Sequence, residues 1–136
     1  MPWHGNYKVA RHSRMNDGTS SDLSQLLATR PGWLLGVQAY SMSSVSPSHL
    51  FVYDTTAAVT TLSVPVWQAV IPYSIFVEGT TRGPTGAGFI MDLSNGLTLD
   101  NGLAYAVSSN SSAKDMTTMP AGLAKVNLQY VTSSCL

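Results

Sequence analysis

The chain has 136 residues and no net charge at pH 7, because seven basic and seven acidic side chains cancel; 44% of its residues are hydrophobic and only 10% are charged. This length allows one domain, and the single cysteine, Cys135, excludes an internal disulfide framework. No apolar run approaches the roughly 20 residues of a membrane span, and the neutral charge balance argues against direct nucleic-acid binding.

The composition favours β-structure. Ser, Thr, Asn and Gly fill the polar positions that Glu and Lys occupy in most proteins. These residues suit strands and turns, whereas a solvated helix normally carries Glu and Lys on its outer face. A neutral surface with few charges also protects poorly against self-association. We therefore expect an all-β chain with much of its surface covered by other chains.

Residues 1–31 differ from the rest, since they hold four of the seven basic residues. A short helix is predicted over about residues 21–29, where leucines form one apolar edge and Pro31 follows. One interpretation is a frayed terminus with a single helical turn. A second is an N-terminal arm that becomes ordered on a neighbouring subunit. The side chains expected to anchor such an arm are Trp3, His4 and Tyr7. A third, nucleic-acid binding, is disfavoured because the basic residues are too few and the whole chain is neutral.

Residues 33–53 predict two strands joined by a polar loop at 41–48, because apolar and polar residues alternate on both sides of it. A connector of small residues follows Asp54. The apolar segment 62–77 contains Trp67 and two prolines, which confine it to a sheet edge or break it near each proline. Residues 78–88 are glycine-rich, but no Lys-Ser/Thr pair or helix follows. We therefore expect a surface loop there and no phosphate-binding loop.

The last third continues this pattern. Asn95-Gly96 and Asn101-Gly102 are tight-turn signals between predicted short strands, and a polar loop at 108–122 precedes a final strand at 124–130. The chain therefore predicts an antiparallel β-sandwich or jelly roll of seven to eight short strands. Residues 32–136 form this domain, and residues 1–31 form the extended N-terminal arm.

No cluster of residues suggests catalysis. No two of the three histidines share metal-ligand spacing with a carboxylate or thiol partner, and no nucleophile elbow surrounds any serine. Asp92 lies within a strand, where it is either an outward-facing residue or a buried general base; we favour the first. Cys135 is expected to be an inert thiol. The sequence therefore predicts a protein without enzymatic activity, cofactor or metal.

Five strand motifs follow one another along the chain: Gly36-Val37-Gln38-Ala39-Tyr40, Phe51-Val52-Tyr53-Asp54, Gly88-Phe89-Ile90-Met91-Asp92, Gly102-Leu103-Ala104-Tyr105-Ala106 and Val126-Asn127-Leu128-Gln129-Tyr130. In this order they resemble the motifs of a family of small virion proteins of phages and prophages. The similarity covers roughly residues 33–131. It departs at the 41–48 loop and in the longer 59–87 segment, and residues 1–30 match no family motif.

This resemblance implies a structural protein of a phage particle, made in the host cytoplasm and placed on the capsid exterior. The expected role is that of a cement or decoration protein at junctions of major capsid subunits, acting as a dimer or trimer. Its partners would be the major capsid protein and itself, with no membrane or nucleic acid. The alternatives are a tail, neck or fibre component, or a carbohydrate-binding β-sandwich. The side chains expected at the protein interface are Trp3, Tyr7, Arg11, Arg14, Trp33 and Trp67.

Overall fold

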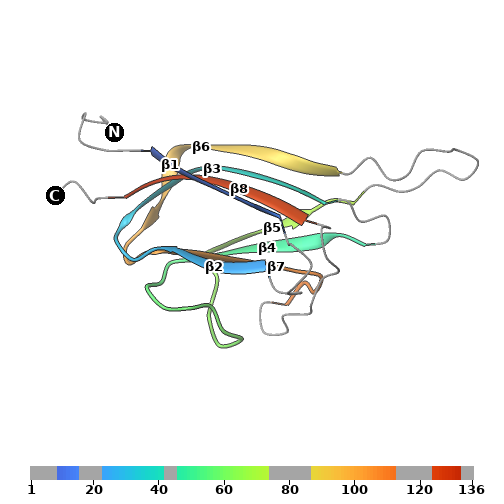
Figure 1. Ribbon diagram of the computed structural model, residues 1–136, viewed down its shortest axis with the longest axis horizontal. Coiled ribbons are helices and arrows are strands. Elements are labelled where there is room, and N and C mark those ends of the chain that lie inside the picture. The colour runs from blue at the N-terminus through green and yellow to red at the C-terminus, as the bar shows by residue number, and fades with distance from the viewer. Residues whose placement is uncertain (1–8, 16–22, 42–45, 74–86, 113–123, 133–136) are drawn as a thin grey trace, which may run out of the picture.

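Eight strands form two stacked antiparallel sheets in the computed structural model, which describes residues 9–15, 23–41, 46–73, 87–112 and 124–132 (Figure 1). The described residues contain no helix. The all-β sandwich that the sequence predicts is therefore confirmed. The strands are β1 (Val9–Met15), β2 (Leu23–Ala28), β3 (Gly32–Ser41), β4 (Ser48–Tyr53), β5 (Trp67–Ile71), β6 (Ala87–Leu99), β7 (Leu103–Ser108) and β8 (Ala124–Thr132).

The chain crosses repeatedly between the two sheets. The first sheet has the strand order β1-β8-β3-β6, and the second has the order β2-β7-β4-β5. Of the described strands, only β4 and β5 are both consecutive in the chain and paired in one sheet. Every other connection between described strands passes from one sheet to the other, so each sheet is built from strands that are far apart in the sequence.

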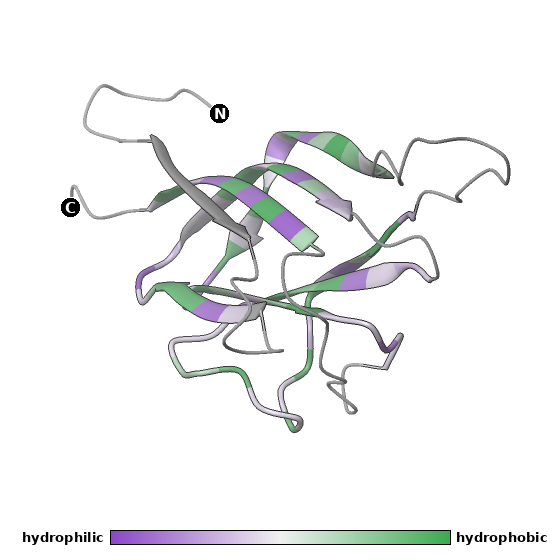
Figure 2. Ribbon diagram, turned by 45° about the vertical axis from the view of Figure 1, so that its right-hand side comes forward, coloured by the Kyte–Doolittle hydropathy of each residue, from purple (hydrophilic) through white to green (hydrophobic). Residues whose placement is uncertain are grey.

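The main core lies between the sheets. Along β8, buried residues alternate with half-buried ones, and Figure 2 shows the matching alternation of hydrophobic and hydrophilic residues. This period of two places one side of each strand against the opposite sheet. The fully buried members of this core are Leu34, Val37, Ala39, Leu50, Val52, Ile71, Leu99, Leu103, Tyr105, Val107, Ala124, Val126 and Leu128.

A second, smaller core lies on the outer face of the second sheet. Phe51 and Tyr53 of β4 pack there with Ala104 and Ala106 of β7, and all four are buried. Val59, in the connector between β4 and β5, packs against them. The connector at residues 54–66 therefore covers part of this face. In Figure 1 it lies beneath the second sheet. Strands β4 and β7 are consequently buried on both faces.

The predicted helix over residues 21–29 is wrong. Residues 23–28 form β2, which pairs with β7, and residues 9–15 form β1, which pairs with β8. Leu26 packs against the outer core and Leu27 against the main core. Consecutive residues that face opposite sides require a strand, so both cores favour extended backbone here. Much of the segment expected to be an arm is thus part of the two sheets.

The turn predicted at Asn95-Gly96 is also wrong, because β6 continues through both residues to Leu99. Gly96 adopts a left-handed φ of 73°, and the pairing of β6 with β3 shifts register at this point. The Asn-Gly signal therefore marks a bulge in a long strand. By contrast, the turn predicted at Asn101-Gly102 is confirmed, since it joins β6 to β7.

Candidate interaction surfaces

An uncharged segment runs from the end of β4 through β5, the edge strand of the second sheet. Between Asp54 and Glu78 the sequence contains no Asp, Glu, Lys, Arg or His. The described part of this segment comprises the connector, then β5, then two further residues. Among the described strands, β5 pairs with β4 alone and ends its sheet. The edge position that the sequence predicts for this proline-flanked segment is therefore confirmed, with Pro65 before the strand and Pro72 directly after it.

Large apolar side chains are exposed along this segment. Leu62 is 90% exposed and Val64 is 79% exposed, although both are hydrophobic. Val66 and Val70 follow at 51% and 56%. From residue 64 to residue 70 the exposed positions alternate with less exposed ones, as in a half-buried strand. We call Leu62, Val64, Val66 and Val70 the apolar stripe.

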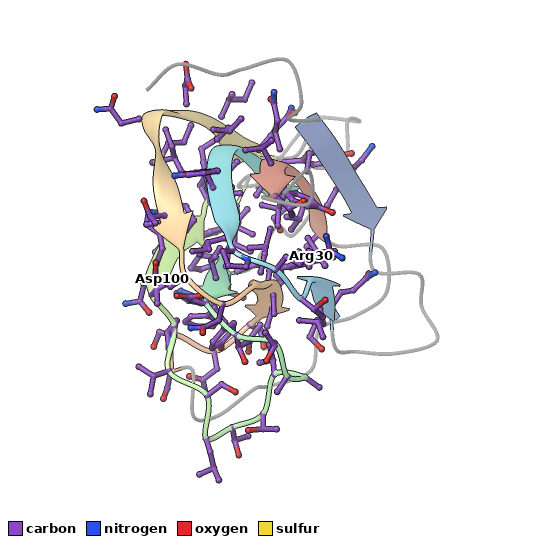
Figure 3. The ribbon with its side chains drawn as sticks, turned by 90° about the vertical axis from the view of Figure 1, so that its left-hand side faces the viewer. Arg30 and Asp100 are labelled. Atoms are coloured by element: carbon purple, nitrogen blue, oxygen red, sulfur yellow. The ribbon has the colours of Figure 1, made fainter. Side chains whose placement is uncertain are left out.

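Local hydrogen bonds give the connector a defined shape. The Thr60 N–H donates to Ser63 Oγ at 2.9 Å, and the Ser63 N–H donates back to the Thr60 carbonyl at 3.0 Å. The Leu62 N–H donates to Thr60 Oγ1 at 3.2 Å. Side chains at the tip of the connector point away from the sheets in Figure 3. The exposure of Leu62 therefore belongs to an ordered turn.

The second surface is a shallow depression on the outer face of the first sheet, with a volume of about 730 Å³. Its floor includes Gly36, where β3 has no side chain. Amide side chains of Gln38, Asn127 and Gln129 surround the floor, and Asn127 Nδ2 donates to Gln38 Oε1 at 3.4 Å. Such neutral donors and acceptors are suited to a polar, uncharged ligand.

One carboxylate and several apolar residues complete the lining of the depression, among them Leu35, Val37 and Leu128. Asp92 is exposed and stands opposite Gly36 in the pairing of β6 with β3. Its outward orientation, which the sequence favoured, is confirmed, and this position rules out a buried general base. Ile90 and Met91 of β6 form the apolar rim, and Ile90 is 79% exposed. The rim also lies at the edge of the first sheet, since β6 pairs only with β3 among the strands that the structure describes.

The structure describes only part of the set of residues that the sequence proposed for an interface. Trp3 and Tyr7 lie outside the described residues. Arg11 and Arg14 lie on β1, where the structure describes the backbone pairing only. Their interface roles stay predictions.

Both remaining tryptophans support the fold. Trp67 is half-buried and packs against the main core. Trp33 is half-buried beside Gly96, where an added Cβ would lie 3.2 Å from the Trp33 Cβ. Their positions do not form an open aromatic platform. The apolar stripe was not predicted from the sequence, although two signals could have indicated it: the uncharged run and the alternation of apolar residues at 64–70.

Within the described residues, no group of three or more His, Cys, Asp or Glu side chains is arranged to hold a metal. No helix in this part of the chain is long and apolar enough to cross a membrane. No protein-family model matches the chain, and no curated protein sequence matches it. The fold and these surfaces define a β-sandwich with an apolar stripe at one sheet edge and, on the other sheet, a polar depression with a single carboxylate.

Proposed function

We propose that this chain is a structural protein of a phage particle, namely a capsid cement or decoration protein that binds at junctions of major capsid subunits. The observation that carries the proposal is the strand order, β1-β8-β3-β6 over β2-β7-β4-β5. We infer that this order is that of a jelly roll, in which eight strands form two Greek keys across two sheets. Jelly rolls recur in viral capsid domains.

Two features of the sequence support the same role. The ordered strand motifs between residues 33 and 131 resemble those of small phage virion proteins. The chain also carries only 10% charged residues, and charged residues are depleted from the centres of protein interfaces. A fold shared with many functions does not define one function by itself, so the proposal rests on the fold together with these features.

The tip of the connector is the proposed contact with the capsid. Leu62 and Val64 project from a turn that Thr60 and Ser63 hold in place. Burying each side chain against an apolar site on a capsid subunit would contribute about 1.5–3 kcal/mol. Capsid binding through this tip would need no acid, base or metal ligand.

Co-sedimentation with assembled capsids that lack this protein tests the proposal. The wild-type chain should saturate the shells at a fixed ratio. Leu62→Lys should weaken binding at least tenfold, because burying a lysine without a partner is costly. Ile90→Lys is the matched control, since Ile90 is also apolar and largely exposed, at 79% against 90% for Leu62, but lies on β6; it should bind as the wild type does.

Failure of the wild-type chain to bind shells would overturn the cement role. Retention on isolated tails or necks would instead favour a tail, neck or fibre component. If both lysine variants bound shells normally, the capsid contact would lie elsewhere on the molecule.

The depression on the first sheet supports a second candidate, a carbohydrate-binding module. Its amide groups and Asp92 can donate to and accept from sugar hydroxyls, and its volume lies within the usual range for small ligands. Because the described aromatic side chains form no stacking platform over it, we rank this function second. A glycan screen should then show binding that Gln129→Ala abolishes and Leu62→Lys leaves unchanged; no binding to any glycan would remove this candidate.

A further inference from the structure

The outward side chains at the edge of β5 read the same in both directions, although Trp67 and Ala69 on the opposite face differ. They are Val66, directly before the strand, and Gln68 and Val70 on it, and all three are exposed. Val66 precedes Gln68 by two residues and Val70 follows it by two. A second copy of the strand, turned by a two-fold axis at Gln68, would therefore present the same side chains in the same order.

Symmetric dimers require this property. In a two-fold interface the same patch meets itself, so the patch must be self-complementary. We propose that two copies of this chain pair β5 against β5, antiparallel, about a two-fold axis through Gln68. Val66 then stands opposite Val70 of the second copy, and the two glutamines stand opposite each other. The second sheet of one copy then joins the second sheet of the other, which gives one continuous sheet of eight strands.

The pairing of side chains across this axis is favourable. Directly opposed side chains in an antiparallel pair have Cβ atoms about 4.5–5.5 Å apart, so β-branched residues there contact each other. The proposed register gives two Val–Val pairs, one on each side of a Gln–Gln pair. The two amide side chains have both donors and acceptors and can bond to each other. All three pairs lie on the outer face of the joined sheet.

The charge pattern identifies the occupant as a second copy. Edge strands usually carry charges, especially lysine, that keep other strands away. Strand β5 carries none, and no charged residue occurs from Thr55 to Val77. Two identical copies therefore meet without repulsion between like charges, and the edge offers no charge to attract an acidic or basic partner.

The prolines limit the association to two copies. Pro65 and Pro72 lack a backbone N–H and lie at either end of the segment Val66–Ile71. The ladder between the copies therefore cannot extend into the flanking chain. Since each copy uses its own β5 once, the contact closes upon itself and builds a dimer instead of a fibre.

This inference specifies the self-association included in the proposed function but does not depend on capsid binding. The two can fail separately, because the dimer is tested with the purified chain alone. Capsid binding is assigned to Leu62 and Val64, and the dimer to Val66, Gln68 and Val70.

Sedimentation of the purified full chain provides the first test. The wild-type chain should sediment as a concentration-dependent dimer. Val70→Lys should raise the dissociation constant at least tenfold, because the lysine would face an apolar valine of the second copy. Ile90→Lys, on the free edge of the other sheet, should leave it unchanged. Circular dichroism of both variants should match the wild type, because both positions are exposed.

A cysteine placed on the two-fold axis tests the register. The native Cys135 is first replaced by serine, and Gln68→Cys is then introduced. Cβ atoms of directly opposed residues lie close to the spacing that a disulfide spans, so mild oxidation should give a covalent dimer. Thr98→Cys at an exposed position on β6, in the same Cys135→Ser background, should give no covalent dimer under the same conditions. A wild-type monomer at all concentrations, or a dimer that Gln68→Cys does not cross-link, would overturn the proposal.

Discussion

The carboxylate of Asp54 binds the backbone of Asn101, 47 residues further along the chain, with Oδ1 accepting the Asn101 N–H at 2.8 Å. The same oxygen accepts the Gly102 N–H at 3.2 Å, and Oδ2 accepts the Asp100 N–H at 3.0 Å. One side chain at the end of β4 thereby satisfies three donors in the turn between β6 and β7. Asp100, labelled in Figure 3, marks this turn. Asp54 thus fixes the turn that connects the two sheets.

Loss of this carboxylate should destabilise the fold. In Asp54→Ala the three backbone N–H groups lose the carboxylate and can hydrogen-bond only with water. We expect the free energy of unfolding at pH 7 to fall by about 1–2 kcal/mol. Asp54→Asn should cost less, because its amide oxygen can still accept from Asn101 and Gly102. Urea unfolding checks both values. The control is Asp92→Asn on the exposed sheet face, which should change stability by less than about 0.5 kcal/mol.

The contribution of Asp54 should also depend on pH. Burial raises the pKa of its carboxyl group, but the hydrogen bonds from Asn101, Asp100 and Gly102 outweigh this effect and lower the pKa below the ordinary 3.8. The stabilisation is therefore complete above pH 3.8 and is lost as the pH falls through the lower pKa of the folded state. The stability gap between wild type and Asp54→Asn should stay constant from pH 8 to pH 5 and close in stronger acid. A gap that widens in acid would contradict this assignment.

The sequence predicts the sandwich well because its strands alternate with a period of two. Val126, Leu128 and the polar residues between them specify a strand with one buried face without any knowledge of its partner. The errors at residues 21–29 and at Asn95-Gly96 have a different cause. Leu26 and Leu27 face two different cores, and Gly96 lies in a bulge set by the pairing of β6 with β3. Both outcomes depend on strands remote in sequence, which local patterns do not encode.

Two glycines in the described strands and turns should respond oppositely to alanine. At Gly102 an added Cβ would collide with the carbonyl oxygens of Ala28 and Thr55, both backbone atoms that cannot rotate away. Gly102→Ala should therefore cost at least about 2 kcal/mol. At Gly36 the nearest heavy atom to an added Cβ is the Met91 carbonyl oxygen at 3.6 Å, an ordinary contact.

Gly36→Ala should consequently be neutral or stabilising by up to about 1 kcal/mol, since alanine reduces the freedom of the unfolded chain. Thermal unfolding of both variants side by side measures the difference. Equal losses at the two positions would show that the requirement for glycine is not steric. Gly36→Ala also adds a methyl group to the floor of the depression, so it should weaken any glycan binding without loss of stability.

The hydroxyl group of Tyr53 is buried and has no hydrogen-bond partner within the described structure. Burial also raises the pKa of this phenol above its ordinary value. Because a buried unpaired polar group costs free energy, Tyr53→Phe should be neutral or stabilising by up to about 1 kcal/mol. Phe51→Ala, which empties the neighbouring position in the same outer core, should cost about 3–5 kcal/mol. A clear loss of stability in Tyr53→Phe, measured by urea unfolding, would show that the hydroxyl group has a partner.

The interaction surfaces were harder to predict than the fold. Aromatic residues often anchor interfaces, which favoured Trp33 and Trp67 in the sequence. In the folded chain Trp67 packs against the main core, and the exposed apolar side chains are aliphatic. The depression around Gly36 was invisible because Gln38, Asn127 and Asp92 come from three strands. Only the pairing of β3 with β6 and β8 brings them together.

His49 should make stability sensitive to mild acid. Burial lowers the pKa of its imidazole below the ordinary 6.5, and its paired neighbours, Val70 on β5 and Ser108 on β7, carry no charge. The unfolded chain therefore binds the proton more tightly, so stability falls as the pH drops below 6.5 and levels off below the pKa of the folded state. His49→Gln should remove this part of the pH dependence, which corresponds to a difference of less than one bound proton between the unfolded and the folded chain. Stability at pH 8 should stay nearly unchanged. Urea midpoints measured for both proteins between pH 8 and pH 5 provide the comparison. Parallel curves would mean that other groups cause the acid sensitivity.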